Sequence, residues 1–332
     1  MGGLLRTVAL LGPLVIGAGF DTTTSAQGNA VAPEPVSMSM SVLPPAPAPV
    51  VMAMAATVAE QTGVEPVHPV GKPSLHEIQW TVGEEESVDA LASRWGIKRR
   101  ALVELNSELR GKQRVKPGMR LWVYRANDSM PTRSVGAPNS GRLEHGMPMP
   151  EGSFWKLRER RTRAFGATNA IEAMVTAFTE YGRSFDDAPL VSVGEISARR
   201  GGKAAPHRSH RTGRDVDIGY ILSEGMERER WQRADANNFD VERNWALIRA
   251  LVETGEVQQI FISVRLQRLL RPLAERELSE AEFARYFRVP GDERDMPPIL
   301  KHWDGHRDHM HVRFRCGSGE SRCRSRSKSG RS

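Results

Sequence analysis

Apolar residues recur along this chain with two different periods. Polar and apolar side chains alternate from 309 to 314, which predicts a strand with Met310, Val312 and Phe314 on one face. Between 170 and 181, apolar residues instead recur three and four positions apart, as on one face of a helix. Helices mixed with mostly isolated strands indicate an α+β fold. The predicted helices of this region are 170–181, 241–254 and 265–277, and its predicted strands are 190–196, 215–222, 257–263 and 309–314.

A smaller unit is predicted at 75–125. Ser87 is a candidate N-cap, and Val88, Leu91 and Trp95 follow it at helical spacing, up to a stop at Gly96. A Lys-Pro-Gly turn at 116–118 separates the second helix from an alternating segment. The predicted order is therefore strand 78–82, helix 87–95, helix 98–106 and strand 119–123.

This β-α-α-β order resembles a LysM module. The resemblance implies binding of N-acetylglucosamine-containing glycans such as peptidoglycan; the alternative is a small structural spacer. Two departures from the family pattern are Glu84-Glu85-Glu86 in place of Gly-Asp-Thr, and Trp80 where tyrosine is common. The matching motifs are Trp80-Thr81-Val82, Ser87, Leu91-Ala92, Trp95-Gly96-Ile97, Leu102, Leu105-Asn106 and Lys116-Pro117-Gly118-Met119-Arg120-Leu121.

The remaining segments differ from these two units in composition. Residues 1–26 combine Arg6, an apolar run and small residues before Gln27, which is typical of an export signal. The run is too short for a comfortable membrane span, so we expect no stable transmembrane segment and a periplasmic or secreted protein. We expect a Pro/Ala-rich linker at 27–74, a second linker at 126–135, and a basic disordered tail at 318–332.

The chain carries a formal net charge of +7. A basic balance suits nucleic acid, an anionic membrane or an anionic cell-wall polymer. Much of the excess comes from local runs, at 158–163 and in the tail, which we interpret as solvated surface, so no nucleic-acid partner is predicted. Cys316 and Cys323 are the only cysteines, and in an exported protein they either close a small disulfide loop or stay free.

Histidine and aspartate gather on the polar faces of two predicted strands. Six of the nine histidines lie between 207 and 311. His311 shares a strand face with His309, and Asp217 lies opposite the apolar face of its own strand. His210 lies in a loop just before that strand. Hydrolytic zinc commonly takes three protein ligands and leaves a position for water, so we predict that His210, Asp217 and His311 bind Zn²⁺.

The neighbouring side chains are candidates for proton transfer and charge stabilisation. His309 could take the proton of the attacking water. His306 and His207 could stabilise the developing oxyanion or assist the leaving amine. Asp308 or Asp215 could orient an imidazole by a hydrogen bond to the ring nitrogen that does not bind the metal.

Three longer motifs resemble the penicillin-insensitive murein endopeptidases, within the wider group of zinc peptidases that includes lysostaphin-type enzymes and D-Ala-D-Ala dipeptidases. The resemblance covers roughly 136–317. The motifs are Val193-Gly194-Glu195-Ile196-Ser197 followed by Gly201-Gly202, then His207-Arg208-Ser209-His210-Arg211-Thr212-Gly213-Arg214-Asp215-Val216-Asp217-Ile218, and Trp303-Asp304-Gly305-His306-Arg307-Asp308-His309-Met310-His311-Val312-Arg313.

The resemblance implies a zinc peptidase domain with a central antiparallel sheet and flanking helices. It implies metal ligation by His210, Asp217 and His311, and active-site roles for the histidines at 207, 306 and 309. The implied reaction is hydrolysis of the D-alanyl to meso-diaminopimelate cross-link of peptidoglycan, without a serine nucleophile and hence insensitive to β-lactams. Arg211 replaces a common glutamine and Glu195 a common aspartate.

Two alternatives stay open from the sequence. A D,D- or L,D-carboxypeptidase, or a dipeptidase acting on stem peptides, would use an arginine to bind a terminal carboxylate, and Arg211, Arg214 and Arg313 are available. Arg211 and Arg313 are accordingly predicted substrate-binding residues. The other alternative is a non-catalytic wall-binding protein with a structural zinc, which would close the metal shell with four protein ligands.

Overall fold

The computed structural model describes residues 75–158, 161–203, 205, 207–223, 230–289 and 297–325. The predicted signal at 1–26 and the predicted linker at 27–74 lie outside the described residues. Within the described part of the chain, no helix is long and apolar enough to span a membrane.

Residues 75–125 form strands and helices in the predicted order, with a further short strand pair. Strand β1 pairs antiparallel with β4, and β2 pairs with β3. The Ser87 side chain accepts a hydrogen bond from the Ala90 N–H and so caps the first helix. The elements are β1 (Glu77–Thr81), β2 (Glu86–Ser87), α2 (Val88–Arg94), α3 (Arg99–Leu105), η1 (Ser107–Leu109), β3 (Arg114–Val115) and β4 (Arg120–Arg125).

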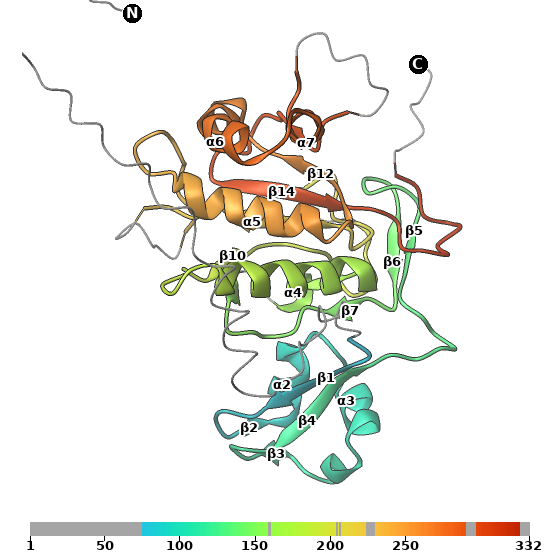
Figure 1. Cartoon of the computed structure of the whole chain (residues 1–332). Helices are drawn as coiled ribbons and strands as arrows, with labels where there is room; N and C mark the ends of the chain where they lie inside the picture. Colours follow the sequence, from blue (N-terminus) through green and yellow to red (C-terminus); the bar gives the residue numbers. More distant parts are fainter. Residues whose placement is uncertain are drawn as a thin grey trace, which may run out of the picture. The chain divides into compact units, whose positions relative to one another are not determined.

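The larger region is α+β, as predicted. Helices α4 and α5 run side by side across one face of its sheet (Figure 1). The elements are β5 (Arg133–Val135), β6 (Arg142–Glu144), β7 (Met147–Pro148), β8 (Trp155–Leu157), η2 (Arg161–Arg163), β9 (Phe165–Gly166), α4 (Thr168–Arg183), β10 (Val191–Val193), β11 (Asp215–Gly219), α5 (Val241–Glu253), β12 (Val257–Phe261), α6 (Val264–Glu277), α7 (Glu280–Tyr286), β13 (Leu300–Lys301) and β14 (His309–Phe314).

The expectation of an antiparallel sheet is correct only for its middle. The six strands lie in the order β13-β12-β14-β11-β10-β8. The inner pairs β12–β14, β14–β11 and β11–β10 are antiparallel, whereas the outer pairs β12–β13 and β10–β8 are parallel. The sheet is therefore mixed. The reason lies in the connections: helix α4 joins β8 to β10, and α6 with α7 joins β12 to β13, and such helical crossovers bring consecutive strands back in parallel.

The alternation in β14 separates a core face from a polar face. Met310, Val312 and Phe314 are fully buried in the hydrophobic core, together with Val216 and Ile218 of the neighbouring strand β11. The other faces of the two strands carry the acidic and histidine side chains. Packing of the apolar face in the core thus fixes the positions of the acidic and histidine side chains on the opposite face.

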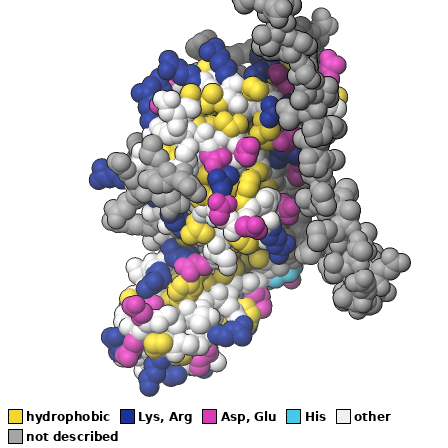
Figure 2. All heavy atoms as spheres, turned by 60° about the vertical axis from the view of Figure 1, so that its left-hand side comes forward, with side chains coloured by type: hydrophobic (Ala, Val, Ile, Leu, Met, Phe, Trp, Pro, Cys, Tyr) yellow, Lys and Arg dark blue, Asp and Glu magenta, His cyan; other side chains and the backbone are white. Residues whose placement is uncertain are grey.

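Hairpin β5–β6 places residues 133–135 with the larger region. The predicted linker boundary at 136 therefore lies inside this hairpin. Charged side chains of both signs are interspersed over the face seen in Figure 2. The interpretation of the basic run at 158–163 as solvated surface is wrong for Arg161, whose side chain is 12% exposed and whose guanidinium lies 3.9 Å from the ring centroid of Trp95.

The predicted disorder from 318 onward is wrong for the part of the tail that is described. Cys316 and Cys323 form a disulfide, and residues up to 325 are placed. Gly136 N–H donates to the carbonyl of Arg322, and Arg324 N–H donates back to the carbonyl of Gly136. These bonds attach the segment to the loop of hairpin β5–β6, which composition alone could not reveal.

Replacing both cysteines with serine is expected to lower the free energy of unfolding by about 2–3 kcal/mol, because the open loop gains conformational freedom in the unfolded chain. The corresponding fall in Tm is roughly 5–10 °C for a domain of this size. Thermal melting of the double variant C316S/C323S beside the wild type measures it. A loss below about 0.5 kcal/mol would contradict this prediction.

Candidate metal centre

Strand register brings the predicted ligands together. In the antiparallel pair β11–β14, Asp217 lies opposite His311, Asp215 opposite Arg313, and Gly219 opposite His309. Directly opposed residues on one face have neighbouring side chains. Two short segments about a hundred residues apart therefore form one polar row across the sheet.

Asp217 is at the centre of this row. Its side chain is 4% exposed. Its Oδ1 lies 2.9 Å from His311 Nδ1, 3.3 Å from His210 Nε2 and 3.8 Å from His309 Nε2. Its Oδ2 lies 3.7 Å from His207 Nδ1. Burial opposes ionisation of Asp217, but His210 and His311 outweigh it and hold the pKa of Asp217 well below its usual range, so the carboxylate is charged.

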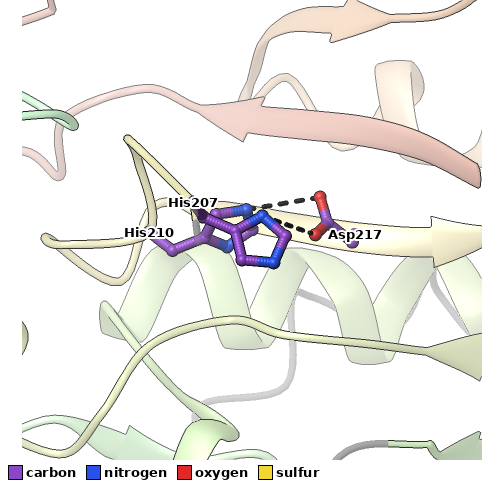
Figure 3. Close-up of side chains that lie close together, drawn as sticks. All are labelled: His207, His210 and Asp217. Atoms are coloured by element: carbon purple, nitrogen blue, oxygen red, sulfur yellow. Dashed lines mark ion pairs between the residues drawn. The ribbon is translucent and has the colours of Figure 1, made fainter. Parts of the chain in front are cut away.

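His210 is held in an uncommon backbone conformation, with φ +62°. Its Nδ1 lies 3.1 Å from the carbonyl oxygen of Ile196, and its own carbonyl accepts a hydrogen bond from Ser197 Oγ. A carbonyl can only accept, so Nδ1 carries the proton and Nε2 presents a lone pair. Figure 3 shows this imidazole and that of His207 beside the carboxylate of Asp217.

The His210 Nε2 atom is the observation that fits a metal. It is fully buried and has no hydrogen-bond partner among the described residues, although an oxygen of Asp217 is close. A lone pair facing a carboxylate in a buried place is unfavourable unless a cation lies between them. Tetrahedral zinc with bonds of about 2.1 Å separates its donors by roughly 3.4 Å, close to the separations found around Asp217. The donor set therefore suits Zn²⁺.

His207 also lies close enough to be a metal ligand. Ligand atoms of His207, His210 and Asp217 all lie within 4.8 Å of one another. The His207 side chain is 35% exposed, whereas that of His311 is 8% exposed. Burial lowers the pKa of His207, against the charge of Asp217. His207 also lies 3.7 Å from Glu195, which pairs with Arg163.

Asp215 supports His311 from the side away from Asp217. This carboxylate is fully buried, and its Oδ1 lies 3.0 Å from His311 Nε2. Arg313 Nε donates to the same oxygen at 2.7 Å. Burial disfavours the charged form of Asp215, but Arg313 and His311 outweigh it and lower its pKa. Arg313, which was predicted to bind substrate, thus pairs with the carboxylate that contacts the candidate ligand His311.

Arg211 is not placed by any contact in this histidine cluster. Its backbone N–H donates to Pro138, its carbonyl accepts from Gly202, and its half-buried side chain has an Nε without a partner in the described chain. A substrate-binding role for Arg211 stays a prediction.

His309 has the geometry of a proton acceptor. Its Nδ1 lies 2.6 Å from Asp308 Oδ1, so Nδ1–H donates to that carboxylate, and its Nε2 faces Asp217 at 3.8 Å. His306 lies beside it, with ring centroids 5.1 Å apart. Burial and the neighbouring imidazoles of His311 and His309 lower the pKa of His306 to about 4, so this ring is neutral.

Sequence reasoning missed Trp231, whose ring is stacked on that of His309. No spacing signal pointed to it, since it lies outside the histidine motifs, in the loop that follows β11.

In metal-free protein, we expect the Tm to fall as the pH rises from about 6.5 to 9. Burial alone would lower the pKa of His311, but hydrogen bonds to Asp215 and Asp217 outweigh it and raise this pKa to about 9. The protonated ring is favoured in the folded state, so its stabilising contribution is complete below the unfolded pKa and is lost through the folded one.

Thermal melting in excess chelator across this pH range measures the slope. The matched variant His311→Asn lacks the titrating ring and should melt with a clearly smaller pH dependence. An equal slope in both proteins would contradict the assignment of this pH dependence to His311.

Comparisons with known proteins point to one family. A model of the penicillin-insensitive murein endopeptidase family matches residues 134–331. A penicillin-insensitive murein endopeptidase of Pectobacterium atrosepticum is 26% identical over 216 residues, which cover 59% of this chain and 69% of that protein. Proteins of the same name from Klebsiella pneumoniae and Haemophilus influenzae are each 25% identical, over 58% and 52% of this chain and 69% and 60% of their own lengths.

Proposed function

The chain belongs to the penicillin-insensitive murein endopeptidase family, and from that membership we propose that it is a zinc-dependent hydrolase of peptide cross-links in peptidoglycan. The proposal of zinc rests on the buried Nε2 atom of His210, which faces Asp217 and has no hydrogen-bond partner among the described residues. His210, Asp217 and His311 are the proposed ligands, because all three are buried and both imidazoles lie within 3.3 Å of the Asp217 carboxylate. Asp215 is also buried but is paired with Arg313. Zinc, when bound, supplies Lewis-acid activation of water and of the scissile carbonyl.

His309 is the proposed proton carrier. Its free Nε2 is directed at the metal-binding donors and would accept the proton of the attacking water. Asp308, bonded to Nδ1, fixes this tautomer and balances the imidazolium charge that forms. The same nitrogen would then return the proton to the leaving amine, which completes hydrolysis without a serine nucleophile.

His306 is proposed to contact the substrate as an acceptor. Its Nδ1 lies 3.2 Å from the carbonyl oxygens of Trp303 and Asp304, so Nδ1 carries the proton of the neutral ring. The remaining nitrogen, Nε2, accepts. A substrate N–H or the attacking water suits that atom better than an oxyanion does, which changes the role expected for His306. His207, which lies between Glu195 and Asp217, remains the proposed contact for the developing negative charge when protonated.

The substrate is proposed to be the D-alanyl to meso-diaminopimelate cross-link. The relatives are murein endopeptidases by name, which supports peptidoglycan as the polymer. We propose that residues 75–125 act as a LysM-like module that binds its glycan strands and raises the local concentration of cross-links. An exported location, periplasmic or secreted, follows from this substrate and from the signal predicted at 1–26.

A carboxypeptidase and a structural zinc protein are the two alternatives. To separate them, purified cross-linked muropeptide dimers and uncross-linked pentapeptide monomers are incubated with the full chain, with and without a β-lactam. The proposed function predicts conversion of dimers to monomers at the same rate in both conditions. Trimmed monomers beside intact dimers would establish a carboxypeptidase, and no conversion of either substrate would favour the structural alternative.

A further inference from the structure

The loop that follows β11 brings one aromatic side chain onto the polar face of the sheet. The ring of Trp231 is stacked on that of His309, with centroids 5.2 Å apart and planes inclined by 27°. Neither the proposed metal ligands nor the proton-transfer groups include this tryptophan. It is therefore a direct neighbour of the reacting centre to which no role has been assigned.

Two glycines make the space that the indole fills. Gly219 is the cross-strand partner of His309, so the position of its missing side chain lies beside His309 on the same face. A Cβ at Gly219 would lie 2.3 Å from Trp231 Nε1, and a Cβ at Gly194 would lie 2.4 Å from Trp231 Cη2. Trp231 thus takes the place that a cross-strand side chain would otherwise occupy.

Several contacts fix the indole in this place. Trp231 Nε1 donates to Ser192 Oγ at 2.8 Å. The guanidinium of Arg158 lies over the ring, 4.7 Å from its centroid. The chain just after the tryptophan is tied to the turn that precedes His309, because Ala234 N–H donates to the carbonyl of Arg307 at 2.7 Å. The indole of Trp231 is therefore held in a fixed position beside the imidazole of His309.

We propose that Trp231 is the positioning residue that holds His309 in its reactive orientation. The bond to Asp308 fixes one edge of the imidazole, but a single hydrogen bond leaves the ring able to swing about that contact. The indole blocks one face, so that Nε2 stays directed at Asp217, 3.8 Å away. This inference rests on the proposed function, because it requires His309 to carry the proton.

The first test compares Trp231→Ala and Trp231→Phe on soluble muropeptide dimers. Alanine is expected to lower kcat about 10- to 100-fold, since a displacement of about 1 Å of a reacting group has an effect of this size. KM, zinc content and Tm should stay close to the wild type. Phenylalanine keeps a stacked ring and should restore most of kcat. The control is Phe185→Ala, which removes another aromatic ring with an arginine over it, Arg243 at 5.4 Å, outside both the histidine cluster and the N-terminal unit.

A double-mutant cycle with Gly219 tests whether the indole itself mediates the effect, and its first variant, Gly219→Ala, leaves Trp231 in place. Gly219→Ala is expected to lower kcat because the added Cβ displaces the indole. In the Trp231→Ala background the same methyl group enters vacated space and should have no further effect. Equal losses from Gly219→Ala in both backgrounds would overturn the inference.

The remaining outcomes are also decisive. If the wild type cleaves dimers and Trp231→Ala keeps kcat within about twofold, the inference falls and the proposed function stands. If kcat, zinc content and Tm fall together in Trp231→Ala and in Trp231→Phe, the tryptophan is structural and the inference is overturned. A wild type that cleaves neither dimers nor monomers overturns the proposed function, and this inference with it.

Discussion

Replacing His309 with alanine is expected to lower kcat by about 10²- to 10⁴-fold, the usual contribution of a positioned general base. The reason is the geometry of its ring: Asp308 binds Nδ1 at 2.6 Å and leaves Nε2 free, 3.8 Å from Asp217. Zinc content should remain at the wild-type level, because the proposed ligands are other residues. Initial rates on muropeptide dimers and metal analysis of the same protein sample measure both quantities.

His76→Ala is the matched control, since its side chain is exposed and lies in the small N-terminal unit. It should leave kcat unchanged. Full activity in His309→Ala would remove this residue from the mechanism. Loss of zinc together with activity would instead make His309 a ligand and contradict the division between ligands and proton carrier.

Replacing Asp217 with asparagine is expected to weaken zinc binding by more than about 10²-fold, beyond the effect of removing a supporting residue. Its carboxylate is the point on which His210 and His311 converge, and an amide supplies neither the charge nor a second oxygen. Turnover should be lost with the metal. Competition with a chromophoric chelator gives the affinity, and excess zinc should recover part of the activity.

Asp215→Asn provides a graded comparison. Asp215 bonds to His311 and Arg313, and so supports a ligand without being one; an effect of about 10- to 100-fold on zinc affinity is expected. Asp186→Asn, at an exposed position, should have none. A larger loss in Asp215→Asn than in Asp217→Asn would reverse the assignment of ligand and support.

Local patterns predicted the elements of this fold well where one face of an element is apolar. The alternation at 309–314 gave β14 with its bounds, and helical spacing gave α4, α5 and α6 to within a few residues. Helix α7 was missed, although Ser279 and Glu282 form the capping box that begins it. The parallel edges of the sheet were missed because strand direction depends on crossovers and not on the strands' own residues.

The sequence singled out residues that meet around Asp217, whose ligation of zinc stays a prediction, but not the side chains that support them. Residue type and strand alternation single out Asp217 and His311, because zinc ligands must project from one face. The register that places Asp215 against Arg313 is a property of strand pairing, which one sequence does not specify. Trp231 reaches the site from a loop, and the side-chain space left by Gly194 and Gly219 admits its ring.

The most direct test of the central claim is mass spectrometry of purified cross-linked muropeptide dimers after incubation with the full chain, as isolated, with a zinc chelator, and with zinc restored. The account predicts conversion of dimers to monomers, loss of that conversion with the chelator, and its recovery with zinc, with fragment masses that locate the cut between D-alanine and meso-diaminopimelate. Conversion that persists in a protein shown to be free of metal, or dimers that stay intact in all three samples, would contradict it.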